Sequence, residues 1–306
     1  MARVLVTGAT GLIGGALIDR LNARGDQVVA LTRDPGHSGA TLAGRAELHG
    51  WAQPTETAPP RAALSGLDGV VHLLGEPIAQ RWSEEVKRQI RDSRVLPTRR
   101  LVSALCELPD DGRPGVLVSQ SATGYYGARG PEPLDETAAP GDDFLSQVVV
   151  AWEREASQAG GAMRVVNTRT GVVLAPGGGA LAKMLPFFRL GIGGPVAGGR
   201  QYVPWIHLDD IVGAILRCLD DGTLSGPVNL TAPQSVTNAQ LSTALGRALR
   251  RPAILPVPAF ALRALYGEMA QVVTTGSRVV PAELQRAGYE FERPDLEPAL
   301  RDLLGS

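Results

Sequence analysis

The stretch RVLVTGATGLIGGAL, residues 3–17, joins a short apolar run to a helical pattern through a glycine-rich turn. Its apolar run, residues 4–6, is typical of a buried parallel strand. Gly8 permits a sharp exit from that strand, Gly11 lets the backbone approach a ligand, and Gly14 lets the helix pack closely on the sheet. The free N–H groups and positive dipole end of the helix then favour an anion such as a pyrophosphate.

A glycine triplet alone is weak evidence, because the chain has 37 glycines and a plain turn is the alternative. The flanking pattern strengthens the functional interpretation. Apolar residues recur at helical spacing over 12–21, Gly25 ends the helix, and a second apolar strand covers 27–32. This βαβ unit predicts dinucleotide binding. The cofactor contacts expected at the turn are Gly8, Thr10, Gly11, Leu12, Ile13 and Gly14.

The end of the second strand bears on the choice of cofactor. An NAD site usually places an acidic residue there, to bind the ribose 2′-hydroxyl. This strand instead ends in Thr32 and Arg33, with Asp34 following. A guanidinium suits a 2′-phosphate, so the sequence favours NADP(H), with Thr32 as a further donor. The alternative is a solvated Arg33, with Asp34 as the ribose ligand.

Composition narrows the class of protein. The 306 residues are 44% hydrophobic and 20% charged, which indicates a globular protein. The net charge of −1 argues against a nucleic-acid partner. Cys106 and Cys218 have no partner spacing for zinc and are interpreted as free thiols of a reducing compartment. The first predicted strand begins at residue 3, so no signal peptide fits before it, and no apolar run is long enough to cross a membrane. We therefore expect a cytoplasmic protein without a membrane partner.

Strand-like runs alternate with helical patterns through the first half of the chain, which predicts an α/β fold with a Rossmann-type, doubly wound parallel sheet. We expect this cofactor domain to cover residues 1–170, with parts of 200–235 returning to it. Residues 171–306 are expected to form a small α+β substrate lobe over the carboxyl ends of the strands, with a family-specific segment from about 251. The predicted strands are 3–7, 27–32, 69–74, 115–119 and 164–168, and the clearest helices are 12–24, 83–108 and 144–159.

Three further segments carry a family resemblance. They read GVVHLLGEPI (69–78), VLVSQSATGYYG (116–127) and GRQYVPWIHLDDIVGAIL (199–216). The chain resembles the extended short-chain dehydrogenases/reductases over essentially its whole length. Within them it is similar to an atypical epimerase-family group, labelled nucleoside-diphosphate-sugar epimerase-like, that ends in a domain of unknown function.

The resemblance implies further cofactor contacts. Leu73 and Leu74, at the end of the fourth strand, would lie along the adenosine half, with Gly75 and Glu76 in the turn beyond. Gln89 and Arg94 of the next helix are further candidates, and Val173, after the sixth strand, would neighbour the nicotinamide. Each could instead be an ordinary core or surface residue.

The family's usual chemistry uses a Tyr and a Lys four residues later, because the Lys charge stabilises the phenolate. This chain has two lysines, Lys87 and Lys183, and neither follows a Tyr at that spacing. If Glu153 takes the family's register, Leu145 and Val149 occupy the Tyr and Lys positions. These side chains cannot transfer a proton.

The remaining catalytic candidates lie after the fifth strand. Ser121 matches the family's hydroxyl position, and Tyr125 or Tyr126 could replace the missing acid. The alternative is that the tyrosines pack a substrate pocket. Gln201 and Trp205 are expected where the substrate lobe meets the cofactor domain, as substrate contacts or as a hydrophobic joint. His207 is a further substrate candidate, with a role as proton carrier as a minor alternative.

The neighbourhood of His207 gives poor support for a metal, because a pair of acids beside it at 209 and 210 lacks a third ligand. We expect no metal site and a helix start at Asp209.

The leading hypothesis is therefore an NADP(H)-dependent oxidoreductase or epimerase-like enzyme with an altered active site, acting on a small molecule. The alternative is a non-catalytic NADP(H)-binding sensor or scaffold. A true sugar-nucleotide epimerase is weaker, since it needs the missing base. The paired helices 83–108 and 144–159 could form a homodimer.

Overall fold

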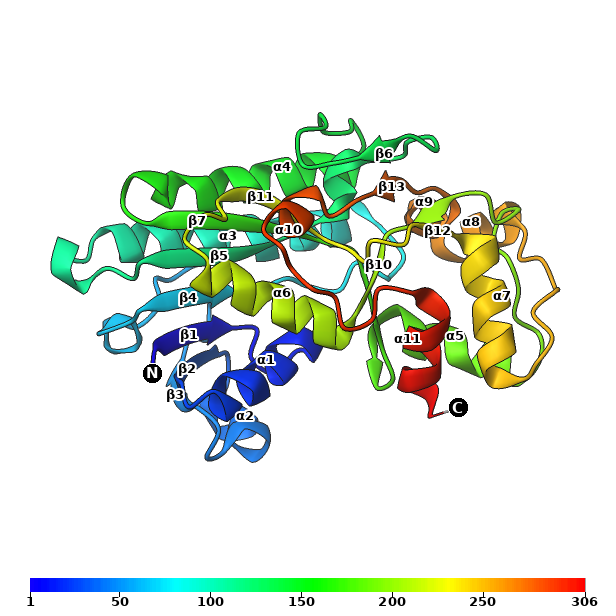
Figure 1. The fold of residues 1–306 in the computed structure, drawn as a ribbon. Helices are drawn as coiled ribbons and strands as arrows, with labels where there is room; N and C mark the ends of the chain where they lie inside the picture. Colours follow the sequence, from blue (N-terminus) through cyan, green and yellow to red (C-terminus); the bar gives the residue numbers. More distant parts are fainter. Residues whose placement is uncertain (306) are drawn as a thin grey trace.

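The computed structural model describes residues 1–305, and its largest element is a seven-stranded parallel sheet (Figure 1). The strand order is β11-β7-β5-β4-β1-β2-β3. Successive strands are added on one side of β1 up to β3 and on the other side from β4 onward, as in a doubly wound fold. The strands are β1 (Arg3–Thr7), β2 (Gln27–Thr32), β3 (Glu47–Gly50), β4 (Gly69–His72), β5 (Val116–Ala122), β7 (Arg164–Thr170) and β11 (Gly226–Leu230).

Helices cover both faces of this sheet, and the strands are apolar for that reason. In β1, Val4 and Val6 point into the core on one face and Leu5 into the core on the other, as the two-residue period requires. The first face is covered by α1 (Leu12–Ala23) and α6 (Leu208–Asp220), the second by α3 (Glu84–Cys106) and α4 (Phe144–Ser157), while α2 (Pro35–Leu42) follows β2.

Most of the remaining elements gather at the carboxyl ends of the strands, where several of them share a hydrophobic core of their own (Figure 1). They include three two-stranded ladders, β10-β8, β12-β9 and β13-β6. The strands are β6 (Pro133–Leu134), β8 (Val172–Ala175), β9 (Tyr202–Val203), β10 (Trp205–His207), β12 (Val236–Thr237) and β13 (Arg278–Val279); the helices are α5 (Gly179–Arg189), α7 (Asn238–Leu249), α8 (Ala259–Tyr266), α9 (Gln271–Thr274), α10 (Ala282–Arg286) and α11 (Leu296–Leu304).

The predicted α/β class and the predicted strands are confirmed, and β11 joins the sheet beside β7. The predicted helix start at Asp209 is wrong by one residue. The helix begins at Leu208, because His207 is its N-cap and accepts a hydrogen bond from the Asp209 backbone N–H. In residues 1–305, no helix is both long and apolar enough to cross a membrane.

The C-terminal segment returns to the sheet. The buried Asp210 carboxylate accepts hydrogen bonds from the backbone N–H groups of Glu292 and Arg293, at 2.7 and 3.0 Å. Leu284 lies in the same core as α1 and α6. The buried Asp210, in the first turn of α6, therefore holds the C-terminal segment at residues 292 and 293, in addition to complementing the helix dipole.

The glycine turn is sterically tight. Gly8 has φ +66°, and a Cβ there would lie 2.7 Å from the Leu73 carbonyl oxygen. A Cβ on Gly14 would lie 2.3 Å from the Gly8 carbonyl oxygen, whereas one on Gly15 would meet nothing closer than 3.9 Å. The turn, α1 and the end of β4 can pack this closely only because these side chains are absent.

Gly14→Ala is expected to lower the free energy of unfolding by about 1–3 kcal/mol, because its methyl group collides with backbone. Gly15→Ala, in the same helix, is the matched control. It is expected to raise stability by up to about 1 kcal/mol through helix propensity. Urea denaturation of both variants checks this, and an unchanged or raised stability of Gly14→Ala would contradict it.

Candidate functional site

The N-terminus of α1 is left open toward the glycine turn. Its N-cap, Gly11, has no side-chain capping bond, and the first turn of the helix holds no acidic residue. Gly11 N–H donates to the Gly8 carbonyl, while Thr10 is exposed. The next N–H groups and the positive end of the helix dipole are therefore available to an anion.

Arg33 directly follows β2, whose end pairs with the end of β1 before this turn, and its side chain is 73% exposed. Its guanidinium faces the Glu76 carboxylate at 3.4 Å, which brings the end of β2 beside the turn after β4. Asp34 is used differently: its carboxylate accepts the His37 backbone N–H as the N-cap of α2. Thr32 Oγ1 lies 2.5 Å from Ser38 Oγ. Of the two candidate ligands for the ribose, Asp34 thus has one carboxylate oxygen committed to the N-cap, whereas Arg33 has a single ion-pair contact, with Glu76.

The exit from β4 is held by hydrogen bonds to residues of β1 and α3. The Leu73 N–H donates to Thr7 Oγ1, and the Arg94 guanidinium donates to the Glu76 carbonyl at 2.9 Å. Gly75 lies against the same guanidinium, since a Cβ there would be 3.1 Å from it. Burial lowers the pKa of Arg94 to about 10. Arg94 therefore acts first as a brace for the 73–76 turn.

Other predicted cofactor residues separate into two groups. Leu12 and Val173 meet at the loop before α5: a Cβ on Gly179 would lie 3.5 Å from the Leu12 side chain and 3.2 Å from the Val173 carbonyl. Leu74 and Ile13 are partly buried against the two cores of the sheet.

Gln89 lies apart from the other predicted contacts. It is exposed and bonds to Glu85, one turn earlier on α3. Five residues along a helix turn a side chain through about 140°, so Gln89 and Arg94 face different directions.

The predicted catalytic residues are joined in one buried network. Ser121 Oγ donates to the Glu153 carboxylate at 2.5 Å, and Arg169 binds the same carboxylate through two N–H groups at 2.8 and 3.0 Å. Burial favours loss of the charge on Arg169, but the hydrogen bond and charge of Glu153 outweigh it and raise the pKa of Arg169 above its ordinary value. The sequence analysis missed Arg169; its signal is a single charge within the stretch 165–170 of a buried strand.

The two tyrosines occupy different positions in this network, although both belong to the short 3-10 helix Thr123–Tyr126. Tyr126 is fully buried: its hydroxyl donates to Asn229 Oδ1 at 2.7 Å and accepts from Arg169 at 3.0 Å. Burial raises the pKa of Tyr126 to about 12. The ring of Tyr125 stacks on the Arg169 guanidinium at 3.4 Å, and its hydroxyl has no hydrogen-bond partner within residues 1–305.

Leu145 and Val149, expected in the family's Tyr and Lys register, both lie next to Gly124 of the short helix that holds the two tyrosines. A Cβ on Gly124 would lie 3.7 Å from Leu145 and 4.0 Å from Val149. Leu145 also packs into a small apolar cluster with Trp82 and Met269, which joins α3, α4 and the segment after α8. Apolar side chains, partly covered by the C-terminal segment, thus fill this part of the site.

The predicted substrate residues mostly carry structural contacts. Trp205 is 1% exposed, lies in the core of the lobe and donates to the Gln234 carbonyl. The Gln201 amide donates to the carbonyls of Val196 and Val273. Gln201 also lines an open hollow of about 510 Å³, together with Arg129, Arg200 and Tyr202. Of the three predicted substrate residues, Gln201 alone is at this hollow.

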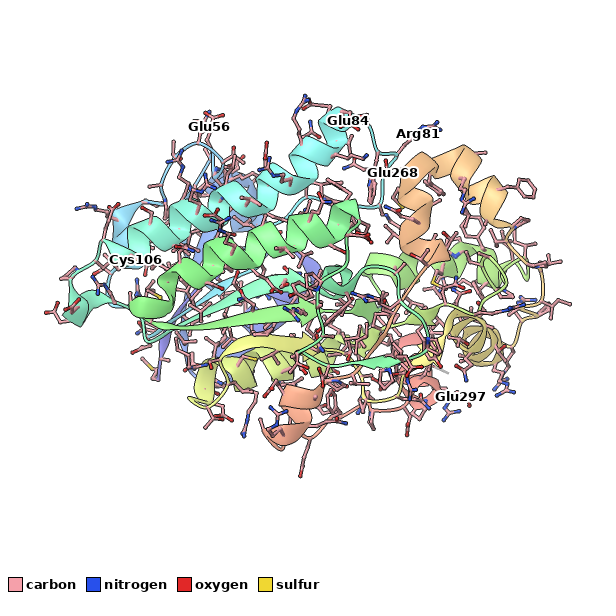
Figure 2. The ribbon with its side chains drawn as sticks, turned by 90° about the horizontal axis from the view of Figure 1, so that it is seen from above. Glu56, Arg81, Glu84, Cys106, Glu268 and Glu297 are labelled. Carbon is pink, nitrogen blue, oxygen red and sulfur yellow. The ribbon has the colours of Figure 1, made fainter. Side chains whose placement is uncertain are left out.

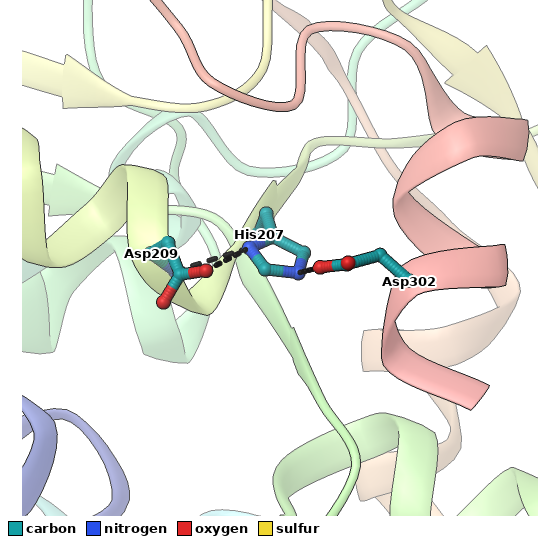
Figure 3. A group of neighbouring side chains, drawn as sticks. All are labelled: His207, Asp209 and Asp302. Atoms are coloured by element: carbon teal, nitrogen blue, oxygen red, sulfur yellow. Dashed lines mark hydrogen bonds and ion pairs between the residues drawn. The ribbon is translucent and has the colours of Figure 1, made fainter. Parts of the chain in front are cut away.

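His207 lies between Asp209 and Asp302, the group of possible metal ligands found within residues 1–305 (Figure 3). Its Nδ1 accepts the Asp209 N–H at 3.1 Å, so the neutral ring carries its proton on Nε2. Nε2 faces Asp302 Oδ2 at 3.5 Å without a well-directed hydrogen bond. A protonated Nε2 cannot ligate a metal, and the contact is better explained as a link between α6 and α11.

Residues 4–230 match the model of the NAD-dependent epimerase/dehydratase family. The chain belongs to this family. Residues 257–303 match a separate domain of unknown function, so the C-terminal segment that covers part of the site is itself a recognised unit. This agrees with the resemblance to extended short-chain dehydrogenases/reductases.

Relatives and solved structures match the chain over nearly its whole length. It is 42% identical to an epimerase family protein of Mycobacterium bovis, covering 98% of this chain and 96% of the relative. It is 40% identical to an Arabidopsis thaliana protein named "Epimerase family protein SDR39U1 homolog, chloroplastic", covering 98% and 86%. The crystal structure of human epimerase family protein SDR39U1 with NADPH matches with a TM-score of 0.89, at 35% identity and 99% coverage of both chains.

Glu153→Ala is expected to lower the free energy of unfolding by about 3–5 kcal/mol, because it leaves the buried Arg169 charge unpaired. Glu155→Ala is the matched control on the same helix. Its carboxylate also binds an arginine, Arg99, but that side chain is 56% exposed, so the expected loss is at most about 1 kcal/mol. Chemical denaturation measures both, and equal losses would contradict the role assigned to the buried pair.

Proposed function

We propose that this protein binds NADP(H) at the glycine turn and acts as an oxidoreductase whose proton transfer does not use a Tyr-Lys pair. The observation that carries the cofactor assignment is Arg33, an exposed guanidinium directly after β2, the strand that pairs with β1 before the uncapped glycine turn. The similarity to human SDR39U1, which was crystallised with NADPH, supports this assignment.

The residues that would hold the cofactor form a continuous path. The N–H groups after Gly11 would bind the pyrophosphate and Arg33 the 2′-phosphate, while the turn at 73–76, braced by Arg94, would flank the adenosine half. Leu12 and Val173 would form the apolar wall near the nicotinamide. When bound, the nicotinamide ring supplies or accepts a hydride.

Among the catalytic candidates, the geometry favours Tyr125 as the proton donor. The Ser121 proton is committed to Glu153, and both hydrogen-bonding roles of the Tyr126 hydroxyl are satisfied inside the protein. The Tyr125 hydroxyl is uncommitted within the described chain, and the stacked Arg169 cation lies against its ring.

A non-catalytic sensor or scaffold is the second candidate. It is favoured by the apolar Leu145 and Val149 at the place where the family's chemistry needs Tyr and Lys, and by the covering of Leu145 by Met269. The substrate, the cytoplasmic location and a homodimer stay predictions under either candidate.

In the native protein, NADPH is expected to bind more tightly than NADH. Arg33→Glu should weaken NADPH binding about 100-fold and reverse this preference, because the lost charge-assisted bonds are replaced by repulsion. Nucleotide fluorescence titration measures both affinities. Arg154→Glu, an equal charge change at an exposed position of α4, should leave them unaltered. Equal affinity of the native protein for both nucleotides would refute the NADP(H) assignment.

Turnover separates the two candidates. With a panel of carbonyl compounds and nucleotide sugars, Tyr125→Phe should lower kcat about 100-fold or more at unchanged NADPH affinity. Tyr126→Phe should mainly lower the thermal midpoint, since it strips a buried hydroxyl from Arg169 and Asn229. Tight NADPH binding without oxidation of the nucleotide by any compound would instead support the sensor. A loss of kcat in Ser121→Ala alone would assign the step to Ser121.

A further inference from the structure

Helices α5, α7 and α8 lie at one end of the molecule (Figure 1), and many of the exposed large apolar side chains belong to α5, α8 and the chain around them. Leu190, Ile254 and Phe260 are 73%, 78% and 75% exposed, and α8 has no buried residue at all. Single exposed apolar residues are ordinary, but a group of them marks a contact surface. We call this group the apolar patch; it consists of Phe187, Leu190, Ile192, Ile254, Leu255 and Phe260.

The two segments that carry the patch are in contact, although they are distant in the sequence. The backbone of Val257 bonds to Pro195 and Ala197, which aligns the chain after α5 with the chain before α8. A Cβ on Gly194 would lie 2.1 Å from the Leu255 carbonyl oxygen, so the two segments are in direct contact. Leu190 and Ile192 are therefore brought to the same end of the molecule as Ile254 and Leu255.

The two segments that carry the patch contain charges of one sign. Residues 179–200 and 238–267 contain seven Lys and Arg and no Asp or Glu, in a chain with a net charge of −1. These cations lie between and beside the patch residues in the sequence. Six of them are exposed and have no carboxylate within 4.0 Å in residues 1–305: Lys183, Arg189, Arg200, Arg250, Arg251 and Arg263.

A hollow beside the patch could receive an anionic group. It measures about 320 Å³ and is lined by Arg250 and Arg251 next to Ile254, with Arg247, which is paired with Glu297. Guanidinium groups bind phosphate oxygens bidentately. A phosphate in this hollow would lie beside an apolar side chain that projects outward.

We propose that the apolar patch and its arginines form a peripheral binding surface for an anionic lipid membrane. Apolar side chains flanked by arginines are the pattern of proteins that lie in the membrane interface, where aliphatic and aromatic groups enter the acyl boundary and the cations meet anionic headgroups. A second copy of this chain is disfavoured as the occupant, because it would bring two sets of unpaired arginines together. The lack of a spanning segment does not bear on such a contact.

Vesicle co-sedimentation of the full chain tests this surface. Vesicles of phosphatidylcholine with 30% phosphatidylglycerol should bind the protein, pure phosphatidylcholine should bind it much more weakly, and high salt should release it. Ile254→Ser/Phe260→Ser and Arg250→Glu/Arg251→Glu should each reduce binding about tenfold or more. Val150→Ser and Arg154→Glu, exposed positions of α4 outside the patch, are the matched controls and should bind as the native protein does.

The altered positions are exposed, so the variants should keep their folding and their NADPH affinity. The test does not depend on cofactor binding and stands if the NADP(H) assignment fails. The proposal is overturned if the native protein ignores anionic vesicles, or if both patch variants bind as well as the controls. It is also overturned if light scattering shows a dimer that the patch variants dissociate while no vesicle binding occurs, because a second copy would then cover the patch.

Discussion

The buried ion pair between Glu153 and Arg169 is the interaction on which the reaction half of the site depends. It joins α4 to β7 and, through Ser121, Tyr125 and Tyr126, also fixes β5 and the short helix after it. A buried charge pair costs desolvation, which is offset only when its remaining hydrogen bonds are satisfied. Here each carboxylate oxygen accepts from Arg169, and the guanidinium is further used by Tyr126 and by the Glu136 carbonyl. The position of every catalytic candidate therefore follows from one electrostatic constraint.

The cofactor half follows a different physical rule. Its geometry comes from close backbone packing at Gly8 and Gly14 and from a helix end with no cap, so it needs few specific side chains. This explains how the two halves can diverge. Leu145 and Val149 remove the usual proton-transfer groups without touching the turn, Arg33 or the brace at Arg94. Cofactor binding and standard alcohol chemistry are separable properties of this fold.

The C-terminal segment connects the two halves. Asp210 holds its end against α6, while near its start Lys87 pairs with Glu268 and Arg81 donates to carbonyls at the end of α8 (Figure 2). Met269 then covers the apolar cluster that contains Leu145. The segment thus closes one side of the site, and it leaves α8 on the outside with its apolar residues exposed. A single stretch of chain therefore takes part in shaping the site and supplies much of the outer surface.

Short-range patterns in the sequence determined the fold class, the strands and the glycine turn, because hydrophobic period and glycine spacing act over a few residues. The same patterns predicted Arg33 at the end of β2. Only the tertiary structure showed that Asp34 is the N-cap of α2 and that Arg33 faces Glu76. The tertiary structure also gave Tyr125 and Tyr126 different contacts and buried Trp205 in the core of the lobe. It showed the role of Arg169, which was not predicted from the sequence. Those outcomes depend on which groups from distant segments satisfy one another's charges and hydrogen bonds, and no local pattern records that.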